Sequence, residues 1–143
     1  MLDTSNSVRS IYVATLNGNL TYSGKNVPVY GQTPIVTTPK NYVVIGSISE
    51  ISDNTNHSFG NDVEVVIDIF SEQYRIYDNG VVDNIASQIL NLLIPSPSVS
   101  GFSDANFFVY PTARTSSRYL PIENGDNFVA RKIITISNLV NQK

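Results

Sequence analysis

Residues 62–72 show an alternation of apolar and polar side chains. The apolar positions are Val63, Val65, Ile67 and Ile69, and the opposite positions are Asp62, Glu64, Asp68 and Glu72, with Val66 and Phe70 among them. A period of two residues is typical of a strand with one buried face. The pattern therefore predicts a half-buried β-strand with an acidic outer face.

The period changes in residues 81–94, which follow after a short break at residues 73–80. Apolar side chains recur at helical spacing at Val82, Ile85, Ala86, Ile89, Leu92 and Leu93, and the run stops at Pro95. This stripe predicts an amphipathic helix. A strand with one apolar face and a helix with one apolar stripe bury both when they pack together.

Weaker periodic stretches complete the expected set of elements. They predict a first helix over residues 5–16, ended by Asn17 and Gly18, and extended segments at residues 27–31, 41–49, 107–110, 114–120 and 128–137, with an interruption at Pro111. Gly46 lies inside the second of these segments, which predicts a bulge or a close approach of two backbones. Polar residues 50–61 predict a hairpin with a long loop, and residues 139–143 a tail.

These elements predict one α+β domain over residues 1–143. The expected architecture is a two-layer sandwich, a mostly antiparallel sheet with two helices packed on one face. The chain has no cysteine, which excludes disulfides and thiolate chemistry. It also lacks an N-terminal signal pattern and a long apolar run, so we expect a soluble protein with no membrane partner.

The charges are unevenly distributed, although the net charge is only −3. Residues 46–104 hold nine acidic residues against one arginine, whereas residues 105–143 hold five basic residues against two acidic ones. The candidate contact charges are Asp62, Glu64, Asp68, Glu72, Arg114, Arg118, Arg131 and Lys132. They are either complementary surfaces of neighbouring subunits or ordinary solvated faces.

Candidate chemistry is sparse. His57 is the single histidine, which excludes a two-histidine metal site, and no phosphate-binding glycine motif or nucleophile elbow occurs. We therefore predict no catalytic, metal-binding or cofactor-binding residue. A pI of about 4.9 argues against tight binding of nucleic acid. The polar loop remains a candidate contact surface, through Glu50, Asp53, Asn54, Asn56, His57 and Phe59.

The order of these segments resembles the tail-completion or tail-terminator proteins of tailed bacteriophages, which include minor tail and head–tail joining proteins. A first amphipathic helix precedes residues 27–31 and a proline-containing loop. Residues 42–46 resemble the family's P-Y-V-V-I-G strand, with Asn41 in place of the usual proline. Residues 65–71 resemble its next strand, with Phe70 at the aromatic position, and residues 83–90 resemble its D-x-I helix.

The resemblance implies a structural virion protein without enzymatic activity. Such proteins form rings, of six or twelve copies, around the DNA channel at the head–tail junction or in the tail. The resemblance implies that the candidate contact charges are either complementary sides of neighbouring subunits or acidic walls of the channel that keep DNA from sticking. The implied partners are further copies of the chain, portal or adaptor proteins, tail proteins, and the genomic DNA that passes through with weak contacts. The alternatives are an assembly adaptor or chaperone that forms no ring, and a small carboxylate-dependent enzyme.

Overall fold

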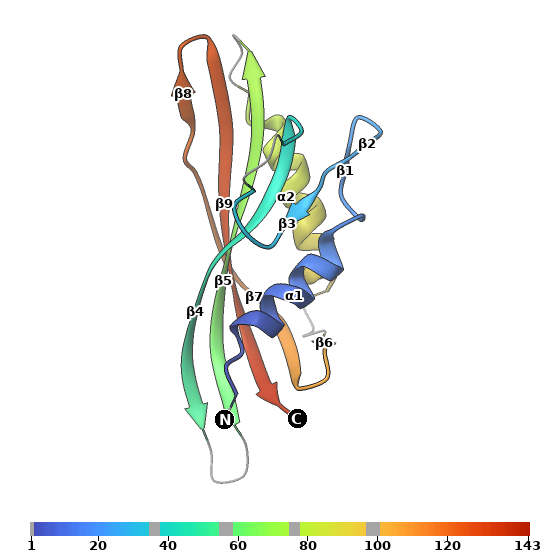
Figure 1. The fold of residues 1–143 in the computed structure, drawn as a ribbon, viewed down its shortest axis with the longest axis vertical. Helices are drawn as coiled ribbons and strands as arrows, with labels where there is room; N and C mark the ends of the chain where they lie inside the picture. The colour runs from blue at the N-terminus through green and yellow to red at the C-terminus, as the bar shows by residue number, and fades with distance from the viewer. Residues whose placement is uncertain (1, 35–37, 55–58, 75–77, 97–100) are drawn as a thin grey trace.

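A computed structural model of the chain describes residues 2–34, 38–54, 59–74, 78–96 and 101–143. Within these ranges, residues 51–54, 59, 60, 113, 114 and 124 are described by their backbone. Two helices and a sheet that is mostly antiparallel make up the fold (Figure 1). The predicted α+β class and the separation into a sheet layer and a helix layer are confirmed.

The helices lie close to their predicted positions. The elements in chain order are α1 (Ser5–Leu16), β1 (Thr21–Tyr22), β2 (Lys25–Asn26), β3 (Val29–Tyr30), β4 (Asn41–Asn54), β5 (Phe59–Tyr74), α2 (Gly80–Leu93), β6 (Phe102–Ser103), β7 (Phe107–Tyr119), β8 (Ile122–Asn124) and β9 (Asn127–Gln142). α1 ends as predicted, because its C-cap is Asn17 and Gly18 follows with a φ of 85°.

The main sheet has the strand order β3-β4-β5-β9-β7-β6, and β8 pairs with β9 beyond the end of β7. All its pairings are antiparallel except that of β3 with β4. β1 and β2 form a separate hairpin. Both helices lie on the same side of the sheet, where α1 contacts β4 and α2 contacts β5 and β9 (Figure 1). The opposite side, which we call the open face, has no helix on it.

The hydrophobic core lies between the helices and the sheet. Val63, Val65, Ile67 and Ile69 of β5 are fully buried, as the alternation predicts. The predicted stripe of α2 is buried as well, except for Leu92, which is partly buried. Full burial of one such side chain contributes about 1.5–3 kcal/mol. One polar contact crosses this core, since the hydroxyl of Tyr12 in α1 donates a 2.6 Å hydrogen bond to Asn138 of β9.

Gly46 occupies the irregular point of β4. The register between β4 and β5 shifts between Ile45 and Ile48, and a Cβ atom on Gly46 would lie 3.2 Å from the carbonyl oxygen of Val66. The bulge and the close backbone approach are therefore both present. Arg9 of α1 holds this point, because its guanidinium donates hydrogen bonds to the carbonyl oxygens of Ile45 and Gly46.

The predicted strand ends are wrong in three places. β4 continues to Asn54 and β5 starts at Phe59, so most of the predicted loop 50–61 is strand. Pro111 pairs with Asn138 inside a continuous β7, and the ladder only shifts register between Pro111 and Thr115. The predicted tail 139–143 belongs to β9, which ends at Gln142. In each place backbone pairing with a neighbouring strand decides the conformation. The local pattern of polar and apolar side chains does not reveal such pairing.

Candidate functional site

The open face carries the acidic side of β5, as the sequence predicts. Glu64 and Glu72 are exposed, and Asp62 and Asp68 are partly buried. No described helix or second sheet covers this side of β5, so the carboxylates of Glu64 and Glu72 face outward. Neither makes a hydrogen bond or ion pair with another described residue. Among the described residues, these two carboxylates are therefore exposed acidic groups of the open face.

Arg131 and Asp68 are joined within the chain. Nη2 of Arg131 lies 3.2 Å from Oδ2 of Asp68, and the guanidinium lies 5.3 Å from the centre of the Phe70 ring. The ring of Tyr42 stacks on the ring of Phe70, with 4.8 Å between the two ring centres. Arg131 and Asp68, two of the candidate contact charges, are therefore paired with each other on the open face. A neighbouring molecule that contacts this pair would also contact the aromatic rings.

Lys132 points to the helix layer, opposite to Arg131, because neighbouring strand residues face opposite sides. Its amine donates a 2.8 Å hydrogen bond to Oδ1 of Asp83 in α2, and the hydroxyl of Tyr119 donates a 2.6 Å bond to the same oxygen. Lys132 also lies over the Tyr119 ring, 4.9 Å from its centre. The three residues tie the end of β7 and the middle of β9 to the first turn of α2.

This three-residue cluster shifts all three pKa values. The hydrogen bond from Lys132, followed by that from Tyr119, holds the pKa of Asp83 below its ordinary value. The hydrogen bond to Asp83 raises the pKa of the Tyr119 hydroxyl. Burial opposes the charge of Lys132, but its hydrogen bond to Asp83 and the charge of that carboxylate outweigh burial and raise the pKa of the amine. The cluster is a stable ion pair at neutral pH.

The remaining candidate residues are spread over the molecule. Arg118 is exposed on the open face, opposite Ile133 of β9, and it makes no hydrogen bond or ion pair with a described residue. Arg114 lies in β7, and its side chain is outside the described part. Glu50 of β4 accepts hydrogen bonds from Thr4 and Asn61. Asp53, Asn54 and Phe59 lie in strands, whereas Asn56 and His57 lie outside the described residues.

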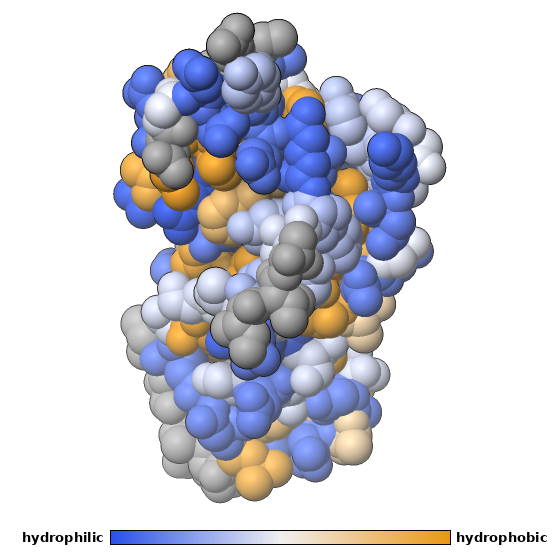
Figure 2. Space-filling view, turned by 45° about the horizontal axis from the view of Figure 1, so that its top comes forward, coloured by the Kyte–Doolittle hydropathy of each residue, from blue (hydrophilic) through white to orange (hydrophobic). Residues whose placement is uncertain are grey.

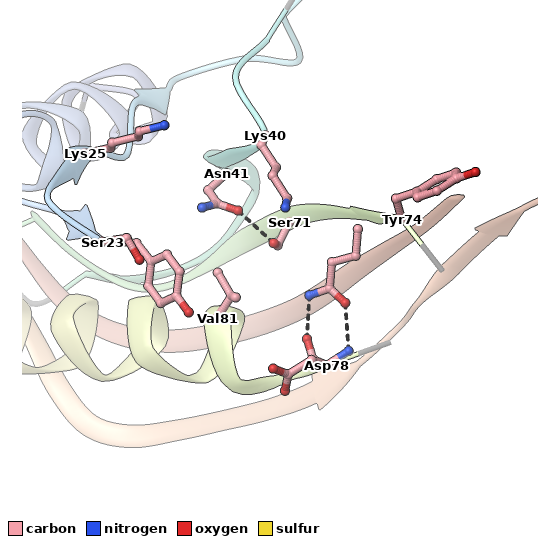
Figure 3. A pocket seen from close by; sticks show the side chains of 10 residues that line it. Ser23, Lys25, Lys40, Asn41, Ser71, Tyr74, Asp78 and Val81 are labelled. Carbon is pink, nitrogen blue, oxygen red and sulfur yellow. Dashed lines mark hydrogen bonds between the residues drawn. The ribbon is translucent and has the colours of Figure 1, made fainter. Parts of the chain in front are cut away.

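A pocket that the sequence does not predict lies on the helix side of the sheet. Its volume is about 390 Å³, and we call it the lysine pocket because Lys25 and Lys40 line it (Figure 3). It lies between the β1–β2 hairpin, the start of β4, the end of β5 and the start of α2. Figure 3 shows both lysine side chains extending toward the same hollow from two separate segments.

Local structure places Lys25 at the rim. Tyr22 pairs with Lys25 across a two-residue turn, and both turn residues, Ser23 and Gly24, have positive φ values of 51° and 75°. The type I′ hairpin turn requires positive φ at both positions, and glycine adopts it readily. The two-residue turn therefore places Lys25 beside Tyr22, at the edge of the pocket.

The far wall of the pocket is held by hydrogen bonds. The side-chain amide of Gln73 donates to the carbonyl oxygen of Asp78 at 2.6 Å and accepts from the Asp78 backbone amide at 2.7 Å. The carboxylate of Asp78 accepts from the amide of Gly80, the first residue of α2, at 2.8 Å. Ser71 donates to Asn41 at 2.7 Å. The amines of Lys25 and Lys40, which also line the pocket, make no hydrogen bond or ion pair with a described residue.

The arrangement suits an anion. The charged residues that line the pocket are Lys25, Lys40 and Asp78, so its lining carries a positive excess in a protein of net charge −3. Sequence reasoning missed it because Lys25 and Lys40 are isolated charges in polar segments. The local signal for a defined position of Lys25 is the Ser23–Gly24 turn directly before it.

Within residues 2–34, 38–54, 59–74, 78–96 and 101–143, no group of three or more histidine, cysteine, aspartate or glutamate side chains is arranged to hold a metal ion. Over the same part of the chain, no helix combines the length and the apolar character that a membrane span needs.

A comparison with solved structures finds similar chains, and one of them comes from a virion particle. It belongs to the structure described as "Virion of native gene transfer agent (GTA) particle". The two chains superpose with a TM-score of 0.54 at 12% sequence identity, over 98% of this chain and 90% of that chain. They therefore share the fold over almost their whole length. A scan against protein-family models and a search of curated protein sequences give no match.

Proposed function

We propose that this chain is a structural virion protein that forms a homo-oligomeric ring around the DNA channel, at the head–tail junction or in the tail. The observation that carries the proposal is the fold shared, over 98% of this chain, with a chain of a gene transfer agent virion. The order of sequence motifs supports it independently, because it resembles the tail-completion and tail-terminator proteins of tailed bacteriophages. Two different kinds of likeness thus indicate the same class of protein.

The shape of the molecule supports a role in assembly. β5 has 16 residues and is about 50 Å long at about 3.3 Å per residue. The paired strands extend past the helices at both ends, as the β4–β5 hairpin below and as β8 with β9 above (Figure 1). Strands that project beyond their own core offer backbone and side chains to neighbouring subunits.

Exposed apolar side chains are found toward both ends of the molecule. Leu120 and Ile122, around the start of β8, are each 44% exposed, and Leu139, toward the end of β9, is 49% exposed. Figure 2, in which the upper end comes forward, shows apolar side chains between hydrophilic ones. Apolar side chains left in water are typical of surfaces that a partner covers. A ring subunit needs such surfaces on two sides, since head-to-tail contacts close a ring.

The partners of the ring are further copies of the chain, portal or adaptor proteins on one side and tail proteins on the other. Contacts with the passing DNA are weak, because the net charge of −3 and the exposed carboxylates of Glu64 and Glu72 oppose phosphate binding. A carboxylate-dependent enzyme is a weaker alternative. Asp68, one of its candidate groups, is already bound to Arg131.

The proposal is tested with the purified protein over a concentration series. Native mass spectrometry should give a discrete assembly of six or twelve copies, and negative-stain electron microscopy of the same sample should show rings with a central opening. A protein that stays monomeric at every concentration, alone and with its neighbouring virion proteins, would contradict the ring and favour a free adaptor or chaperone. Activity of the monomer on a small substrate would favour the enzyme.

A further inference from the structure

The lysine pocket holds basic side chains that have no partner among the described residues. Four of the basic side chains that the structure describes are bound within the chain, namely Arg9, Arg131, Lys132 and Lys143. Those that make no hydrogen bond or ion pair with a described residue are Lys25, Lys40 and Arg118. Two of these three line the lysine pocket. The pocket is therefore the place on the described surface where a negative ligand meets two ammonium groups together.

Both lysines are attached to backbone that is fixed by hydrogen bonds. The carbonyl oxygen of Lys40 accepts a 2.9 Å hydrogen bond from the amide of Glu72 in β5. Lys25 lies in the β1–β2 hairpin, which is tied to α2 because the side-chain amide of Gln88 binds both backbone groups of Thr21. The two points of attachment are thus set before a ligand arrives, which lowers the entropy cost of binding.

Asn41 adds a third donor to the lining. Its side-chain oxygen accepts a hydrogen bond from the buried hydroxyl of Ser71. Its amide nitrogen is turned away from Ser71 and has no hydrogen-bond partner among the described residues (Figure 3). Asp78 is the one acidic residue of the described lining, and its Oδ1 accepts from the amide of Gly80. The lining therefore favours a ligand that carries negative charge and accepts several hydrogen bonds.

Lysine favours a phosphate monoester over a carboxylate at this place. An ammonium group is a compact point charge, whereas the planar guanidinium of arginine matches a carboxylate with two parallel hydrogen bonds. Two lysines therefore select for charge, and a phosphate monoester carries about −1.5 to −2 charges at pH 7. Tyr22 and Val81, which both pack against the hydrophobic core, form an apolar wall beside the amines. The volume of about 390 Å³ is sufficient for a small organic molecule.

We propose that the lysine pocket binds a phosphate monoester group together with the apolar part next to it. Lys25 and Lys40 bind the phosphate from two separate segments, Asn41 donates to a further oxygen, and Tyr22 and Val81 contact the apolar part. A DNA backbone is a poorer ligand, since its affinity depends on many phosphate contacts and the described lining supplies two ammonium groups. The same monoester group occurs in small free phosphates and at the 5′ end of a DNA strand. The site belongs to a single copy and does not depend on the proposed ring.

Phenyl phosphate is the probe, and isothermal titration calorimetry of the full chain in a phosphate-free buffer measures its dissociation constant. Lys25→Gln and Lys40→Gln should each weaken binding about tenfold, because each removes one charged donor. Arg118→Gln removes the same charge outside the pocket and should change the affinity less than about twofold. Asp78→Asn should tighten binding about threefold, since it removes the opposing charge and keeps an oxygen for the Gly80 amide. Loss of folding cannot produce such a gain, and thermal unfolding checks the other variants.

Related ligands separate the parts of the proposal and the sources of the phosphate. Benzoate, which carries less charge on the same ring, and inorganic phosphate, which lacks the ring, should both bind more weakly than phenyl phosphate. A DNA strand that binds more tightly with a 5′-phosphate than without it, and loses this gain in both lysine variants, identifies a DNA end as the source. Equal binding of the two strands, if it is stronger than that of phenyl phosphate, indicates the backbone and overturns the proposal. No saturable binding of phenyl phosphate, or an equal loss in Arg118→Gln and the lysine variants, also overturns it.

Discussion

At the residue scale, Asp83, Lys132 and Tyr119 form an electrostatic cluster that joins α2 to the sheet. Sequence patterns predict Asp83 on the polar side of a helix and Lys132 in a basic segment, but not that they meet. Their contact depends on β9 passing behind α2, and on the alternation that turns Lys132 to the helix layer and Arg131 to the open face. Arg131 and Lys132 are adjacent basic residues in the sequence, but they bind different partners on opposite sides of the sheet.

Asp83→Asn should make unfolding less dependent on pH on the acidic side. The folded protein lowers the pKa of Asp83 from its ordinary value of 3.8. The stabilisation is therefore complete above pH 3.8 and is lost as the pH falls through the lowered pKa. The loss at neutral pH should be under about 1 kcal/mol, since the Asp83 side chain is partly exposed and solvent screens the pair.

The measurement for Asp83→Asn is the free energy of unfolding by urea at several pH values. Asn84→Asp, one position along the same helix, is a control in which the Lys132 contact remains. A difference between wild type and Asp83→Asn that stays constant down to the lowest pH would contradict the assigned ion pair.

At the element scale, β4 and β5 show which features of a strand are visible in its sequence. The alternation along β5 predicts the buried and open sides correctly, because burial of one face acts on every second side chain. Both strands are longer than the pattern of side chains predicts. Their polar ends are held by backbone pairing and not by apolar side chains. The predicted contact loop is for the same reason mostly a projecting hairpin.

Gly46→Ala should destabilise the protein by about 1 kcal/mol, although an alanine in a strand is otherwise more favourable than glycine. The added Cβ atom would lie 3.2 Å from the carbonyl oxygen of Val66, at the point where the β4–β5 register shifts. Chemical denaturation measures the effect, and Ser47→Ala on the exposed neighbouring position is the control. Equal or higher stability of Gly46→Ala would show that β4 moves away from β5 at low cost.

At the scale of the whole molecule, the open face and the two projecting ends determine what this protein presents to others. Helices cover one side of the sheet, and the other side is left with carboxylates, aromatic rings and exposed apolar groups. A single copy therefore does not bury all the surfaces that its sequence makes apolar. Exposed apolar groups of this kind are typical of surfaces that a partner covers, and the proposed ring would supply that partner as further copies of the chain.

Leu120→Ser combined with Ile122→Ser should weaken assembly and leave the fold intact. Both side chains are 44% exposed, so the free energy of unfolding of one copy should change by at most about 0.5 kcal/mol. A partner that covers them would lose the burial of both, and dissociation should move to at least tenfold higher protein concentration. Analytical ultracentrifugation measures this. Leu2→Ser, 48% exposed and away from β8, is the control. Unchanged assembly of the double variant would remove this end from the interface.

The sequence by itself determined the fold class, the two helices, the apolar face of β5 and the irregularity at Gly46, because each follows from the period of side chains or from one unusual residue. The tertiary structure decided which charges are paired and which are free. It joined Arg131 to Asp68 and Lys132 to Asp83, and it brought Lys25 and Lys40 from separate segments to one pocket. These outcomes depend on strand register and on contacts between residues that are far apart in the chain, and local patterns do not contain that information.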